Sequence, residues 1–171
     1  MRSSKRFLAG FCVLAALATA ALAGAGPALG APAWHVQTIS GAPELAGIDF
    51  VDPRHGWTVG RAGEIWATSN GGRTWEAESS GTGADFNAVD FVDLNHGWAV
   101  GSGGEITATS NGGATWTPQT SGTTEFVTDV SFVDASHGFA IAGETVLKTS
   151  DGGATWSPAT ALPSVGKAIA F

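Results

Sequence analysis

Apolar and polar positions alternate over short stretches from Ala46 onward. Segments such as "AGIDFV", "NAVDFV" and "TDVSFV" end at an aspartate, and the apolar "GWTVG", "GWAVG" and "GFAIA" follow them. After a glycine-containing turn come "EIWAT", "EITAT" and "TVLKT", and an "SNGG" or "SDGG" turn then leads into "TWEAE", "TWTPQ" and "TWSPA". Short segments of this kind, bounded by Gly, Asn and Asp, predict β-strands joined by tight turns.

These elements repeat. The motif "FVD-x-x-HG" starts at Phe50, Phe91 and Phe132, a step of 41 residues each time, and the third unit is one residue shorter in a later turn. Four short strands in about forty residues are typical of a propeller blade. We therefore predict an all-β chain of four-stranded antiparallel blades, with full blades at about 46–78, 87–119 and 128–160.

Both ends of the repeat array look incomplete. "WHVQTISG" from Trp34 is similar to the last strand of a blade, and "KAIAF" at 167–171 is similar to the first, so we expect a shared partial fourth blade from 34–41 and 167–171. Propellers close with about 4–8 blades. We expect a fragment of a larger propeller of about seven blades; the alternative is a ring assembled from several chains.

Residues 1–33 have the pattern of a secretory signal peptide: a basic start with Arg2, Lys5 and Arg6, an Ala/Leu-rich stretch, and small residues before Trp34. The alternative is an uncleaved membrane anchor. The single cysteine, Cys12, lies in this segment, which excludes disulfides and thiolate metal sites from the mature chain. We predict an exported protein, periplasmic, thylakoid-lumenal or extracellular.

The chain after the signal carries fifteen acids and five bases, a net charge of −10. Such a charge repels phosphate backbones, so nucleic acid is not an expected partner. The chain also has no tyrosine.

Each "FVD-x-x-HG" motif brings an aspartate within three residues of a histidine. The residues are His55, His96 and His137 with their aspartates. A three-histidine metal site is one interpretation, but equivalent residues of successive repeats lie one per unit and do not converge. We favour a turn in which Asp accepts backbone N–H groups and the following Gly supplies a positive φ.

The segment "TSDGGATW" fits the pattern Ser/Thr-x-Asp-x-Gly-x-Thr-Trp and resembles the Asp-box, or bacterial neuraminidase repeat. In that motif the Asp or Asn holds a hairpin turn and the Gly adopts the left-handed conformation. We expect its tryptophan to fill the seam against the next blade. The box residues are predicted to be structural: Thr68, Asn70, Gly72, Thr74, Trp75, Thr109, Asn111, Gly113, Thr115, Trp116, Thr149, Asp151, Gly153, Thr155 and Trp156.

The two motifs together, from about 46 to 159, resemble the repeat of the photosystem II stability/assembly factor family. The resemblance implies an exported seven-bladed propeller that contacts a reaction-centre subunit through an arginine-rich patch. This sequence departs from that pattern, because Arg54, Arg61 and Arg73 all fall in the first blade. Their second-blade counterparts are Asn95, Ser102 and Ala114.

We expect no catalytic residue, cofactor or metal. Sialidases with Asp-boxes use a tyrosine nucleophile, and the acids of this chain are mostly repeat-equivalent.

We predict a non-catalytic interaction module whose partner is a protein outside the cytoplasm, a photosystem II subunit in a phototroph. Membrane association is expected only through a partner or an uncleaved signal. The alternative is a carbohydrate-binding or glycoside hydrolase-type propeller. The candidate contacts are Arg61, Phe86 and Phe126, and packing between blades is the alternative for the two phenylalanines.

Overall fold

The computed structural model describes residues 36–42 and 44–159, and almost all of them belong to one compact unit that begins at Gln37. The predicted signal peptide and the predicted strand at 167–171 lie outside the described residues. Of the predicted strand at 34–41, residues 36–41 are described and form no strand. No helix within the described ranges is long and apolar enough to span a membrane.

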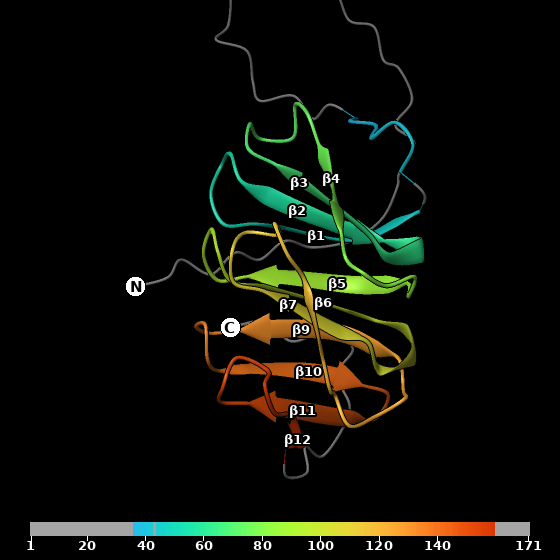
Figure 1. The fold of residues 1–171 in the computed structure, drawn as a ribbon, viewed down its shortest axis with the longest axis vertical. Helices are drawn as coiled ribbons and strands as arrows, with labels where there is room; N and C mark the ends of the chain where they lie inside the picture. Colours follow the sequence, from blue (N-terminus) through green and yellow to red (C-terminus); the bar gives the residue numbers. More distant parts are fainter. Residues whose placement is uncertain (1–35, 43, 160–171) are drawn as a thin grey trace, which may run out of the picture. The chain divides into compact units, whose positions relative to one another are not determined.

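Three four-stranded antiparallel sheets follow one another along the chain (Figure 1). The first blade consists of β1 (Leu45–Phe50), β2 (Gly56–Gly60), β3 (Glu64–Thr68) and β4 (Glu76–Ser79). The second consists of β5 (Phe86–Phe91), β6 (Gly97–Gly101), β7 (Ile106–Thr109) and β8 (Thr117–Gln119). The third consists of β9 (Val127–Phe132), β10 (Gly138–Ala142), β11 (Thr145–Thr149) and β12 (Ser157–Pro158). The all-β prediction is confirmed.

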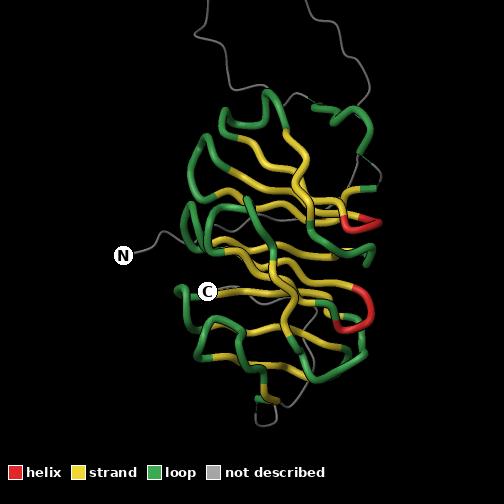
Figure 2. Tube along the Cα trace, viewed as in Figure 1, coloured by secondary structure: helices red, strands yellow, loops and turns green. Residues whose placement is uncertain are grey.

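The turns between the second and third strands differ in the way the sequence predicts. In the first two blades each is a single 3₁₀ turn, η1 (Arg61–Gly63) and η2 (Ser102–Gly104), which lie on the same side of the sheets (Figure 2). The third blade has a shorter turn at Gly143 and Glu144, where the repeat has lost one residue.

The glycine after each histidine has a different role from the one predicted. Gly56, Gly97 and Gly138 do not have positive φ. Each pairs with the last residue of the neighbouring strand, as Gly56 pairs with Phe50. A Cβ on Gly56 would lie 2.6 Å from the Phe50 ring. Glycine is therefore required because an aromatic ring lies flat against its Cα.

The apolar core lies between the blades, in two seams. We call the contact between the first and second blades the first seam, and that between the second and third blades the second seam. In the first seam Trp57 stacks on Phe91 at 3.6 Å between ring centroids, and in the second Trp98 stacks on Phe132 at 3.4 Å. The two buried clusters follow this division.

Hydrogen bonds cross both seams near the first strands of the blades. The Asp49 carboxylate accepts the Phe91 backbone N–H at 2.9 Å, and Asp90 accepts that of Phe132 at 2.7 Å. Because β1 packs against β5 and β5 against β9, these bonds tie successive inner strands together. Both bonds join residues 42 positions apart in the sequence, so the same link recurs at each seam.

Candidate interaction surface

The Asp–His pairs form turns. Asp52 Oδ1 accepts the backbone N–H groups of Arg54 at 2.6 Å and His55 at 2.9 Å, and Asp52 Oδ2 lies 2.8 Å from His55 Nδ1. The same arrangement recurs in the second and third blades. No group of three metal-binding side chains occurs within residues 36–42 and 44–159. The geometry is therefore that of an Asx-type turn with a histidine cap.

These turns lower the pKa of the aspartates. The His55 side chain, assisted by the Arg54 and His55 backbone N–H groups, lowers the pKa of Asp52 to about 2. The pKa of Asp134 is lowered by the backbone N–H groups of Ser136 and His137 and by the His137 side chain. For Asp93, burial raises the pKa, but hydrogen bonds from Asn95 and His96 outweigh it and the net direction is down. The carboxylates remain ionised and hold the turns at neutral pH.

The Asp-box closes the hairpin between the third and fourth strands of each blade. In the third blade Asp151 Oδ1 accepts the Thr155 N–H at 2.9 Å, Asp151 Oδ2 accepts the Thr155 hydroxyl at 2.6 Å, and Thr149 Oγ1 accepts the Gly153 N–H at 2.9 Å. The Thr155 bonds lower the pKa of Asp151 to about 2. Asn70 and Asn111 take the same place in the other blades. These side chains are engaged in the turn itself.

The box tryptophans pack in the opposite direction to the one predicted. Trp116 packs edge-on against Phe91 of its own blade, and its indole N–H donates to Glu78 of the preceding blade at 3.1 Å. Trp156 likewise donates to Gln119 at 3.2 Å. The side chains that extend toward the following blade are instead Trp57 and Trp98, whose indole N–H groups reach Gly112 and Gly152 carbonyls.

The loops between blades lie against the turns between second and third strands. The Asp85 carboxylate accepts the Ala62 backbone N–H at 2.9 Å, and the Phe126 carbonyl accepts the Gly143 N–H at 3.1 Å. Arg61 lies on this face with 62% of its side chain exposed, and its Nε is 3.0 Å from a Glu44 carboxylate oxygen. Its charge is therefore partly compensated.

The two candidate phenylalanines differ in how far they are exposed to solvent. Phe126 is 62% exposed on the loop face, where a partner can reach it. Phe86 is 1% exposed and belongs to the first-seam core, so the expectation that it contacts a partner is wrong. Phe86 is the first residue of β5, as Leu45 is of β1 and Val127 is of β9. This first position of the strand faces the preceding blade.

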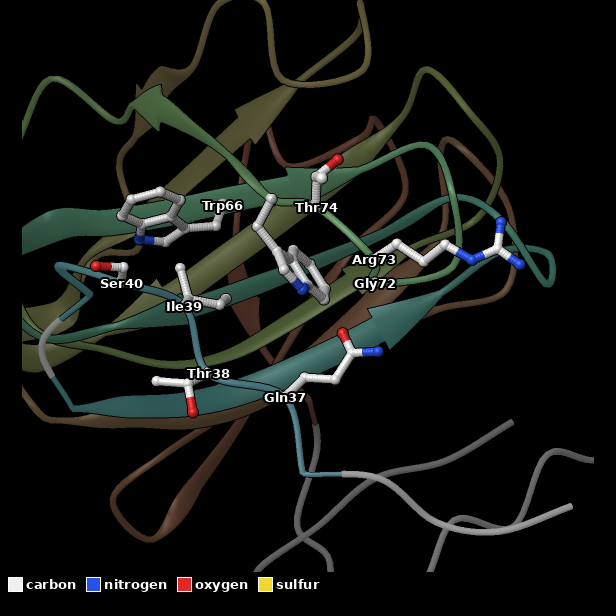
Figure 3. Close-up of a pocket in the computed structure, with 9 residues that line it drawn as sticks. Gln37, Thr38, Ile39, Ser40, Trp66, Gly72, Arg73 and Thr74 are labelled. Carbon is white, nitrogen blue, oxygen red and sulfur yellow. The ribbon is translucent and has the colours of Figure 1, made fainter.

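A groove of about 330 Å³ lies along the first blade, where residues 37–40 run beside its Asp-box (Figure 3). Two of its residues break the repeat. Trp66 stands where the later blades have Thr107 and Leu147, and Arg73 stands where they have Ala114 and Ala154. The Trp66 indole N–H is buried and has no hydrogen-bond partner among the described residues. The Arg73 guanidinium points away from Trp66 and Ile39 (Figure 3).

The sequence prediction did not identify this groove as a candidate site. The signal was present, because aligning the three units shows both departures. A large aromatic residue and an arginine at positions that are otherwise small, apolar or hydroxylated mark a surface unlike that of the other blades. The sequence analysis noted that Arg73 lies in the first blade, but the groove beside Trp66 forms only because residues 37–40 pack there.

Comparison with known families matches residues 27–89 to the photosynthesis system II assembly factor YCF48. No curated protein matches the chain. Among solved structures, YCF48 bound to D1 peptide is 26% identical, with a TM-score of 0.60 over 67% of this chain. YCF48 from Cyanidioschyzon merolae is 25% identical, with a TM-score of 0.59 over the same share. The resemblance to photosystem II assembly factor-like propellers is confirmed.

The likeness extends to other propellers at the level of fold. The GH74 enzyme of Niastella koreensis is 18% identical, with a TM-score of 0.56 over 67% of this chain and 22% of its own. This shows a shared fold. The present chain spans 39% of the length of either YCF48 structure, so it corresponds to part of such a propeller.

Proposed function

We propose that this chain is a non-catalytic interaction module of the photosystem II assembly type, which binds an exposed segment of a protein partner. The observation that carries the proposal is its similarity to YCF48 bound to D1 peptide, at 26% identity over 67% of the chain. In a phototroph the expected partner is a photosystem II subunit. The peptide in that structure makes a peptide segment the natural first probe.

The contact surface that we favour is the loop face with Phe126 and Arg61. Phe126 is a large apolar side chain at 62% exposure, and exposed aromatic residues are typical anchors of protein interfaces. Arg61, on η1, lies on the same side and pairs with Glu44, the residue before β1, so a binding partner meets both an apolar anchor and a charge pair. The Asp–His turns and Asp-boxes are excluded from this role because their polar groups are occupied within the turns.

Binding to overlapping peptides of a photosystem II D1 subunit, measured by fluorescence anisotropy, tests the proposal. We expect binding that weakens about tenfold or more in Phe126→Ala, the loss typical of an interface anchor. Leu94→Ala is the matched control, because Leu94 is also apolar and 47% exposed but lies in the β5–β6 turn, away from the loop face. Absence of binding to every peptide, or equal losses in both variants, would contradict it.

We infer that the chain does not hydrolyse glycans. Asp52, Asp93 and Asp134 hold turn N–H groups, and Glu44 pairs with Arg61, which supports structural roles for these acids. A reducing-sugar assay on soluble glucans is expected to give the same value as buffer. Hydrolysis that disappears on changing a single acid would overturn the inference.

We also propose export of the chain. This rests on the basic and Ala/Leu-rich pattern of residues 1–33. Mass spectrometry of the protein recovered from a secretion-competent host is expected to give an N-terminus within or just after that segment. An intact Met1 on protein found entirely in the cytoplasm would contradict export.

A further inference from the structure

A polar side chain that precedes each blade in the sequence meets the Asp-box of that blade. The positions are Gln37, Glu78 and Gln119, each 41 residues apart. A Cβ on Gly72 would lie 2.9 Å from the Gln37 amide oxygen, and Cβ atoms on Gly113 and Gly153 would overlap with the Glu78 and Gln119 side chains. The three side chains thus occupy the same place, and only one of them carries an ionisable group.

In the second seam the amide makes two hydrogen bonds. Gln119 Oε1 accepts the Trp156 indole N–H at 3.2 Å, and Gln119 Nε2 donates to the Gly152 carbonyl at 2.9 Å. The Trp98 indole N–H donates to that same carbonyl at 2.9 Å. Gln119 thus acts here as both acceptor and donor, and an amide supplies both.

In the first seam an ionised Glu78 can accept a hydrogen bond, as Gln119 does, but cannot donate one. Glu78 Oε2 accepts the Trp116 indole N–H at 3.1 Å. A carboxylate has no proton to give to the Gly112 carbonyl, which receives the Trp57 indole N–H at a longer 3.3 Å. A protonated Glu78 has the O–H that the position requires.

Among the described residues, the elements packed against Glu78 present no cation to it. The second-blade box turn, 109–116, and β8 contain no charged residue, and Ala114 stands where the first blade has Arg73. On its own blade the nearby charges are Glu76 on β4 and Glu64 on β3, both acidic, while His55 lines the adjacent groove and is paired with Asp52. Burial raises the pKa of Glu78. The Trp116 indole N–H, which donates to Glu78, and the nearby Trp57 indole N–H, which donates to the Gly112 carbonyl, oppose this only in part.

We propose that the first seam is a pH-sensitive joint, which holds the first blade to the second more tightly when Glu78 is protonated and donates to the Gly112 carbonyl as Gln119 donates to Gly152. Because the folded-state pKa lies above the ordinary value of 4.5, this contribution is complete below 4.5 and is lost as the pH rises through the folded-state value. The second seam, with its amide, lacks this dependence.

Two reciprocal variants test the joint. Urea unfolding, followed by tryptophan fluorescence from acidic to neutral pH, is expected to give a higher midpoint for Glu78→Gln than for wild type at neutral pH, with the two converging below 4.5. Gln119→Glu should create the same dependence in the second seam and lower the midpoint at neutral pH. The other acidic residues are the same in the wild type and in both variants. A difference in the pH dependence of the unfolding midpoint therefore reports on residue 78 or residue 119 alone.

A direct measurement makes the result independent of the folding of the variants. In ¹⁵N-indole NMR spectra of the wild type, the Trp116 Nε1–H resonance should titrate with Glu78, whereas that of Trp156, bonded to Gln119, should stay constant. A Trp116 resonance that does not move between acidic and neutral pH would overturn the proposal. So would identical pH profiles for wild type and Glu78→Gln.

Discussion

The indole of Trp98 lies flat on the ring of Phe132, with centroids 3.4 Å apart and ring planes only 5° from parallel. One ring belongs to β6 of the second blade and the other to β9 of the third, so the contact joins two sheets. Trp98 is 2% exposed and Phe132 is also 2% exposed. The stack lies at the centre of the second seam.

Trp98→Ala should therefore destabilise the protein strongly. We expect a loss of about 3–5 kcal/mol in the free energy of unfolding, as for other large-to-small changes in cores. Trp66→Ala is the control, since Trp66 lines the groove of the first blade and is only partly buried. Chemical denaturation measures both, and equal small losses would contradict the seam as the main site of stabilisation.

Gly97→Ala should destabilise even though its φ is ordinary. The new methyl group would overlap with the Phe91 ring, and overpacking of this kind costs about 1–3 kcal/mol. Gly83→Ala is the matched control, because a Cβ there meets no atom within 4 Å and its φ is not positive. Thermal unfolding of the two variants separates the effects. A neutral Gly97→Ala would show that the aromatic contact does not require glycine.

Asp90→Ala should weaken the link between the inner strands. It leaves the buried Phe132 N–H without its acceptor at 2.7 Å, which costs about 1–3 kcal/mol. Asp90→Asn keeps an oxygen acceptor and should lose less. Amide hydrogen exchange at Phe132 reports the bond directly and should quicken more in the alanine variant; equal exchange rates in all three proteins would contradict the assignment.

The third Asp-box should contribute a pH dependence that the other two lack. The pKa of Asp151 falls from its ordinary 3.8 to about 2, so its contribution is present above 3.8 and is lost as the pH falls through about 2. Asp151→Asn gives this box the residue of Asn70 and Asn111 and should reduce the acid sensitivity of the Thr155 amide resonance in NMR spectra. A Thr155 resonance with the same acid titration in both proteins would contradict it.

The sequence predicted the strands and blades because alternation and spacing are local properties of the chain. All three box hairpins and all three Asp–His turns also follow from residues within four or five positions of one another. The short turn of the third blade follows from a single lost residue.

What the sequence did not predict depends on which neighbour a side chain meets. The periodic Trp116 indicates a seam but not its direction, and the structure shows that it faces the preceding blade. Phe86 is exposed or buried according to how closely the preceding sheet packs, which alternation within one strand does not determine. Glu78 looks like an ordinary surface acid until it is aligned with Gln119 and placed against Gly113.

The placement of the core between sheets has a consequence for how such a chain can change in length. The second blade supplies Phe91 to the first seam and Trp98 to the second, so excising that one 41-residue period would bring Trp57 against Phe132, the same pair of chemical surfaces. Loss of a whole repeat therefore keeps the aromatic pairing of the seams, whereas the single-residue loss in the third blade falls in a turn.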